Sequence, residues 1–152
     1  MGWQVGQWGV PDEYFGDYFD DLKLNTSRFD PQQIRYSQAG YSEQGNGYTV
    51  SGNTEWLKAN PGQDLPTKPI RIFVKDPIMN DWGPKTNKGY TGDSVNLLDG
   101  KIYTLDHRRL VAYNNAGRSS IPVEWVTDLR FLRTQVYKFS TQNYGTNIIQ
   151  NP

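Results

Sequence analysis

The residues best suited to chemistry stand together in the stretch YTLDHRRLVAYNNAG, residues 103–117. It contains Asp106, the pair Arg108–Arg109 and His107, the only histidine of the chain. These charged residues follow a strand-like run and precede a helix-like run. They therefore mark a predicted strand-to-helix junction, which raises the question of whether the junction binds an anion.

A helix start exposes unpaired backbone N–H groups and carries a partial positive charge, so it can bind phosphate or carboxylate. Arg108 and Arg109 in the first turn oppose the helix dipole, which is mildly unfavourable unless an anion or Asp106 lies among them. Arginine can hold phosphate through paired hydrogen bonds. His107 can donate or accept a proton near neutral pH. The pattern is therefore compatible with a phosphate site, with His107 as a candidate acid or base.

A simpler interpretation fits the same residues. Asp106 would cap the helix, one arginine would pair with an acid, and His107 would be a surface residue. The residues alone leave both interpretations open.

The composition limits the classes of function. The length of 152 residues suits one domain, and the lack of cysteine excludes disulfides and thiolate zinc sites. Lys+Arg and Asp+Glu both number 16, so the formal net charge of zero does not indicate a strongly basic nucleic-acid binder. No apolar run approaches the roughly 20 residues of a membrane span. We see no signal-peptide pattern at the start of the sequence.

Periodicity predicts the elements around the junction. Ile70, Ile72 and Val74 alternate with other residues and make 69–75 the clearest strand. Asp106 is the expected N-cap of the junction helix, and Gly117 its expected stop. The other predicted strands are 34–41, KIYTL at 101–105 and IPVEWV at 121–126. The other predicted helices are TEWLKAN, capped by Asn53 or Thr54, and residues 127–138.

The remaining segments are assigned by composition. Residues 1–33 are an aromatic and acidic lead-in to a domain at 34–152. Residues 42–53 are a polar loop or short hairpin. Residues 76–99 are rich in Gly, Pro, Asn and Asp and are predicted to form a long insertion or lid. The order of elements predicts a small single-domain α/β (α+β) fold, with a mixed sheet and flanking helices.

The runs PIRIFVK, DGKIYTLDHRRLVAYNNAG and IPVEWV together resemble the ParB/sulfiredoxin-like domain. That family has two strands joined by a Gly turn, a charged box that opens a helix, a Gly stop and a VPV-type strand. In this chain the box is residues 105–109, the stop is Gly117 and the last strand begins at Ile121. Residues 34–38 correspond to the upstream I-x-x-Q-like element of the family. The resemblance spans roughly residues 34–126.

The runs IRYSQAGYS, KIYTLDHRRLVAYNNAG and KFSTQNYGTNI are also similar to C-terminal toxin domains of bacterial Rhs-repeat and contact-dependent-inhibition proteins. The chain departs from them at His107, where Asn is usual. The resemblance implies an effector delivered from a bacterium as part of a larger protein and acting in the target-cell cytoplasm. It implies a cognate immunity protein as partner and a nuclease or nucleotide-dependent phosphotransferase activity on nucleic acid or a nucleotide.

The resemblance also implies roles for individual residues. It assigns catalysis to Asp106, His107 and Arg109, with Asp106 capping the helix, orienting the arginines or holding a metal through phosphate. The implied cofactor is a nucleotide or a divalent metal. The implied phosphate or substrate contacts are Arg35, Ser37, Gln38, Arg108, Thr141, Asn143 and Thr146. Without the resemblance, the first three are an ordinary strand end and the last three a hydrogen-bonded turn.

Two other functions stay open. Some delivered toxins are ADP-ribosyltransferases with an arginine on an early strand, a place that Arg35 could fill. Their Glu-x-Glu pair has no counterpart here, since Glu124 stands alone in VEWV. The other alternative is a nucleotide- or DNA-binding module without enzymatic activity.

Overall fold

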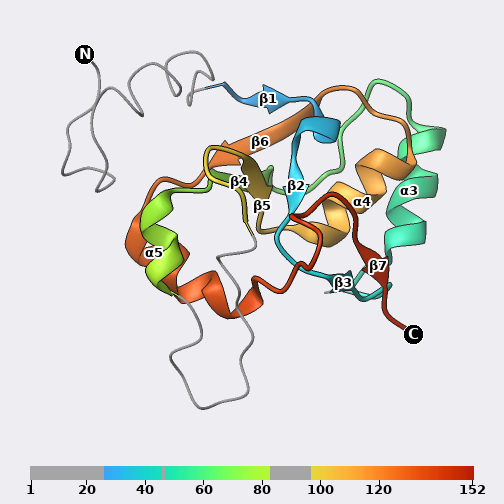
Figure 1. Ribbon diagram of the computed structural model, residues 1–152. Coiled ribbons are helices and arrows are strands. Elements are labelled where there is room, and N and C mark those ends of the chain that lie inside the picture. Colours follow the sequence, from blue (N-terminus) through green and yellow to red (C-terminus); the bar gives the residue numbers. More distant parts are fainter. Residues whose placement is uncertain (1–25, 46, 83–96) are drawn as a thin grey trace.

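The computed structural model describes residues 26–45, 47–82 and 97–152, which form a mixed sheet with helices on both of its faces (Figure 1). Within these residues the main sheet has the strand order β1-β6-β4-β5-β2. Its strands are β1 Arg28–Phe29, β2 Arg35–Tyr36, β4 Ile70–Val74, β5 Ile102–Thr104 and β6 Ile121–Trp125. The helices are α3 Val50–Ala59, α4 His107–Asn115 and α5 Leu129–Gln135. The predicted mixed α/β class is confirmed.

The central strand β4 is covered on both faces. It runs parallel to β6 and antiparallel to β5. Alternate residues of a strand point to opposite faces, so Ile70, Ile72 and Val74 join the core under α3 and α4. Phe73 joins a second core with Leu132 of α5. The predicted alternation is therefore present, but it separates two apolar cores rather than a core from solvent.

The junction helix α4 has the predicted limits. Asp106 stands at its N-cap position. Gly117 follows its end at φ 74°, a left-handed conformation that glycine adopts without strain. The Arg118 N–H donates to the Tyr113 carbonyl at 3.1 Å, which closes the last turn. The helix thus begins just after β5, with Asp106 as its N-cap residue, and ends before Gly117.

The start of α3 was predicted incorrectly. The helix begins at Val50, and its N-cap is Thr49, whose side chain accepts from the Gly52 N–H at 2.9 Å. Val50 is 2 % exposed, so burial of this residue favours the extra turn. The predicted loop at 42–53 therefore ends in a helix, after an antiparallel bridge between Gln44 and Thr49.

The predicted strand at 34–41 is two short strands with a bend between them. Residues 37–39 form the bend between β2 and β3 (Gly40–Tyr41). β2 pairs in parallel with β5, and β3 pairs in parallel with β7 (Ile149–Gln150) near the end of the chain. The bend carries the backbone from the sheet edge to the start of α4.

Three further features complete the described fold. The strand β1 lies in the predicted lead-in 1–33 and pairs with β6, while residues 1–25 lie outside the described residues. The predicted insertion 76–99 begins with a 3-10 helix, Pro77–Trp82, and its residues 83–96 also lie outside the described part. No helix among the described residues is long and apolar enough to cross a membrane.

Asp76 follows β4 as a fully buried carboxylate. Its Oδ1 accepts from the Ile78 N–H at 2.8 Å, and its Oδ2 is buried without a hydrogen-bond partner among the described residues. Burial raises the pKa of this carboxyl to about 6. Ionisation of a carboxyl with a raised folded-state pKa costs stability, so that cost develops as the pH rises from about 4 through 6.

We expect the Asp76→Asn substitution to stabilise the fold at pH 7 by on the order of 2 kcal/mol, and by less at pH 5. Asparagine keeps the acceptor for the Ile78 N–H and removes the buried charge. Thermal unfolding at the two pH values measures the difference. A variant less stable than the wild type at pH 7 would contradict this account.

Candidate functional site

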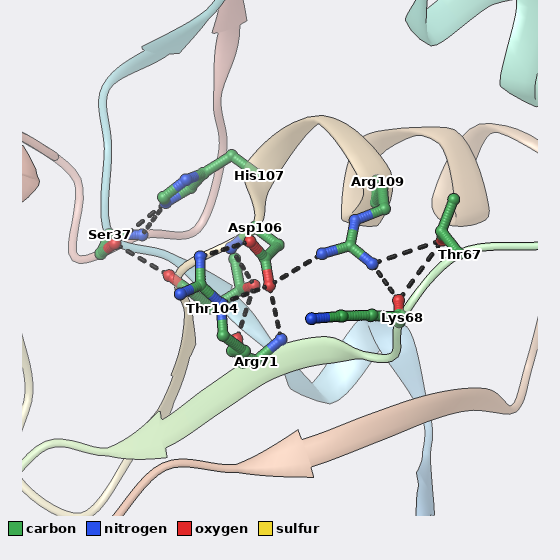
Figure 2. Close-up of polar contacts among 8 residues, drawn as sticks. All are labelled: Ser37, Thr67, Lys68, Arg71, Thr104, Asp106, His107 and Arg109. Atoms are coloured by element: carbon green, nitrogen blue, oxygen red, sulfur yellow. Dashed lines mark hydrogen bonds and ion pairs between the residues drawn. The ribbon is translucent and has the colours of Figure 1, made fainter. Parts of the chain in front are cut away.

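Asp106 joins the start of α4 to the middle of the sheet (Figure 2). Its Oδ2 accepts from the backbone N–H of Arg71 at 2.7 Å and from the Arg71 Nε at 3.1 Å. Its Oδ1 accepts from the Arg71 Nη2 at 2.8 Å. Arg109, one helical turn on, approaches Oδ2 to 3.1 Å. We call these three residues the Asp106 clamp.

The charges of the clamp stabilise one another. Burial alone raises the pKa of Asp106, but the hydrogen bonds from Arg71 and the charge of Arg109 bring it below the ordinary value. Arg109 also donates to the Lys68 carbonyl. Its side chain is only 14 % exposed. Arg109 is therefore committed to contacts within the protein and has little surface left for a ligand.

Because the Asp106 carboxylate faces β4, it does not cap the helix. Asp106 is the N-cap residue, as predicted, but its side chain makes no hydrogen bond to the N–H groups of the first turn. The backbone N–H groups of residues 107–109 have no acceptor among the described residues. The helix start therefore keeps the unpaired donors and the partial positive charge that can attract an anion.

His107 is a buried residue, which differs from the simpler sequence interpretation. The Ser37 N–H donates to its Nε2 at 3.2 Å, and the Ser37 hydroxyl lies 2.9 Å from the same nitrogen. Tyr36 stacks on the imidazole at a ring-centroid distance of 6.4 Å. A nitrogen that accepts from a backbone N–H carries no proton, so the ring proton is on Nδ1. The contact fixes the bend after β2 to the first turn of α4.

Ser37 and His107 are spaced like a nucleophile and its base, but Ser37 is too buried for a substrate to reach its hydroxyl. Ser37 is 0 % exposed and His107 is 6 % exposed. Burial lowers the pKa of His107 to about 3, so the ring is neutral at pH 7. These contacts support a positioning role for both residues.

A pocket of about 470 Å³ lies at the N-terminus of α4, and we call it the junction pocket. Its described lining includes four cationic side chains and one carboxylate. The cations are Arg71, Arg108, Arg109 and Lys138, and the carboxylate is Asp106. The lining also includes Gln38 and the hydroxyl-bearing residues Tyr41, Ser42 and Tyr48. Cations outnumber acids, so the junction pocket is suited to a polar anion.

Arg108 is the cation most available to a ligand there. It makes no hydrogen bond or ion pair with the described residues, and its Nε is buried without a partner. Its side chain passes close to the backbone of Gly45, where a Cβ would lie 2.6 Å from the Arg108 Nε. A larger residue at position 45 would therefore displace Arg108. The guanidinium therefore packs against the Gly45 backbone, and no acid among the described residues pairs with it.

The structure separates the predicted site residues into four groups. Asp106, His107, Arg108, Arg109 and Gln38 line the junction pocket. Ser37 does not line the junction pocket but contacts His107, which does. Arg35 and Thr146 line a second pocket of about 520 Å³ at the sheet edge.

Thr141 and Asn143 belong to a hydrogen-bonded turn. The Thr141 hydroxyl donates to the Asn143 Oδ1 at 2.9 Å and accepts from the Gly145 N–H at 2.9 Å. The same region fixes the bend after β2, because the N–H groups of Ser140 and Thr141 both approach the Ser37 carbonyl. The contacts agree with the turn interpretation of these two residues.

Sequence reasoning missed Arg71 and Lys138 as pocket residues. Arg71 had a detectable signal, because it is the one charged residue within the apolar strand IRIFV. Lys138 had no detectable signal in the sequence, because it is the course of the backbone after α5 that places it at the junction pocket. Among the described residues, no group of three or more His, Asp or Glu side chains could hold a metal ion.

Comparisons with known proteins leave the site to be interpreted from its own geometry. No family model matches the chain, and neither the curated proteins nor the solved structures contain a match to it.

We expect Asp106→Asn to destabilise the fold by about 3 kcal/mol, because it leaves two partly buried arginines without their counter-ion. This corresponds to a fall in melting temperature of roughly 10 °C. Arg108→Gln removes a side chain that has no hydrogen-bond or ion-pair partner in the described part of the chain, and it should change stability by less than about 0.5 kcal/mol. Thermal unfolding of both variants tests the distinction. Equal losses would show that Arg108 is also structural.

His107 predicts a second pH effect. Its folded-state pKa of about 3 lies below the ordinary value of 6.5, so its stabilising contribution is present above pH 6.5 and is lost as the pH falls toward 3. We expect His107→Asn to lose less stability than the wild type between pH 7 and pH 5, by about 1–2 kcal/mol. Denaturant unfolding at both pH values measures this. Parallel losses in the two proteins would contradict a buried neutral imidazole.

Proposed function

We propose that the junction pocket binds the phosphate group of a nucleotide or nucleic acid, and that the chain is a delivered bacterial toxin domain acting on that ligand. The observation that carries the phosphate proposal is Arg108, whose guanidinium has no hydrogen-bond or ion-pair partner among the described residues and lies on the first turn of α4, where the N–H groups also have none. Such donors bind phosphate through charge and through directed hydrogen bonds. The toxin part of the proposal is supported by the sequence resemblance.

The contacts suggest a division of roles within the predicted catalytic set. Arg108 and the helix N-terminus hold the phosphate, and Lys138 adds positive charge to the lining of the junction pocket. Asp106 and Arg109 position the first turn of α4 through the clamp. His107 positions the same turn through Ser37. In this proposal, Asp106, Arg109 and His107 affect binding through the shape of the junction pocket.

The ADP-ribosyltransferase alternative gains no support from the geometry. Arg35 donates to the Tyr144 carbonyl at 3.1 Å and lines the pocket at the sheet edge, whereas the box residues line the junction pocket. Glu124 is an exposed residue of β6 and lines neither of these two pockets. The residues that this chemistry would use are therefore spread over different surfaces.

Titration with inorganic phosphate and with a nucleoside 5′-monophosphate, followed by calorimetry at low salt, tests the phosphate site. We expect Arg108→Gln to weaken binding of both ligands about tenfold, because a charge-assisted pair contributes roughly 1.5–3 kcal/mol. The matched control is Arg130→Gln, which changes an exposed arginine of α5 that lines no part of the junction pocket. Equal affinities for the wild type and Arg108→Gln would refute the site.

Growth of bacteria that express the chain tests the toxin part separately. We expect the wild type and Arg130→Gln to slow growth and Arg108→Gln to restore it. Cell extracts analysed for degraded nucleic acid and for changed nucleotide pools identify the reaction. If the wild-type chain is folded and abundant but does not slow growth, the toxin proposal is wrong. The phosphate-binding proposal is unaffected by that result.

A further inference from the structure

A third cavity, a hollow of about 340 Å³, adjoins the junction pocket. Arg71 and Arg109 line both cavities, so the Asp106 clamp forms the boundary between them. The hollow adds Lys68, Pro69 and Glu124, and we call it the outer hollow. A ligand seated at Arg108 could therefore extend past the clamp into a second bounded space.

The outer hollow offers one donor and one acceptor that are not paired with each other. Lys68 and Glu124 are both exposed, and the described residues contain no ion pair between them. The Lys68 backbone carbonyl accepts from Arg109, and Figure 2 shows the Lys68 side chain extending beside the clamp. Glu124 lies on β6 in register with Arg71 of β4. Lys68 lies in the segment that leads into β4, and Glu124 lies on the neighbouring strand β6.

The two cavities differ in charge. The arginines of the clamp share Asp106, and the outer hollow then adds one positive and one negative charge, Lys68 and Glu124. The junction pocket instead adds Arg108 and Lys138 without a further acid among its described lining. The junction pocket therefore has the larger excess of positive charge and is the better place for an anionic group, whereas the outer hollow, with Lys68 and Glu124, suits a neutral group with several hydroxyls. Glu124 disfavours a second phosphate there by like-charge repulsion.

We propose that the outer hollow binds the sugar of a sugar phosphate whose phosphate group occupies the junction pocket. The inference rests on the proposed phosphate site and specifies its ligand. Glu124 accepts hydrogen bonds from sugar hydroxyls, and Lys68 donates to a hydroxyl or ring oxygen. Arg71, fixed by Asp106 and lying 5.8 Å over the Phe131 ring, forms the wall between phosphate and sugar.

The ligands that test this are inorganic phosphate, pyrophosphate, ribose 5-phosphate and a nucleoside 5′-monophosphate, titrated against the whole chain. We expect ribose 5-phosphate to bind about tenfold more tightly than phosphate. Glu124→Gln should remove most of that gain and leave phosphate affinity unchanged or slightly higher. Lys68→Gln should weaken ribose 5-phosphate about threefold. The matched controls, Glu55→Gln and Lys58→Gln, change exposed residues of α3 and should alter neither ligand.

The outcomes separate the two proposals. If phosphate binds in an Arg108-dependent manner but ribose 5-phosphate binds no more tightly, the sugar site is wrong and the phosphate site stands. If Glu124→Gln tightens ribose 5-phosphate binding, or pyrophosphate exceeds ribose 5-phosphate, the outer hollow is a second anion site and the inference fails. If none of the four ligands binds the wild type, both proposals fail. A nucleotide that binds more tightly than ribose 5-phosphate identifies a nucleotide as the source of the sugar phosphate, and equal affinities identify a free sugar phosphate.

Discussion

The arrangement of the site depends on the carboxylate of Asp106. It receives a backbone N–H and two guanidinium hydrogens from Arg71 and an ion pair from Arg109, so it ties the first turn of α4 to the central strand β4. Because the carboxylate is used in this way, the helix start is left uncapped. A structural contact thereby creates the unpaired donors on which the proposed phosphate site relies.

A second contact fixes the same turn from the sheet edge. His107, neutral and buried, accepts from the Ser37 backbone and holds the bend between β2 and β3. The turn around Thr141 fixes that bend from its other side. The first turn of α4 is thus constrained by β4 and by the bend after β2, and Arg108 projects from it without a protein partner among the described residues. Neighbouring arginines in one motif consequently have different roles, one in stability and one available to a ligand.

The sequence predicted the helices and strands more accurately than it predicted the contacts between their side chains. The β4 strand, the α4 limits and the glycine stop at Gly117 follow from local periodicity and turn chemistry, and all are present. The α3 start was missed because burial of Val50 outweighs the polar, Gly-rich composition before it. The strand at 34–41 was read as continuous because a bend stabilised by distant residues leaves no local signal.

The sequence by itself determined that charged residues stand at a strand-to-helix junction, because periodicity and capping are properties of neighbouring residues. Only the tertiary structure decided which charges are neutralised. Arg71 is 35 positions from Asp106, and the pairing of β4 with β5 brings the two together. The chain after α5 likewise brings Lys138 to the junction pocket. Hydrogen bonds and ion pairs depend on distance in space, so local sequence could place the motif but could not divide its residues between stability and binding.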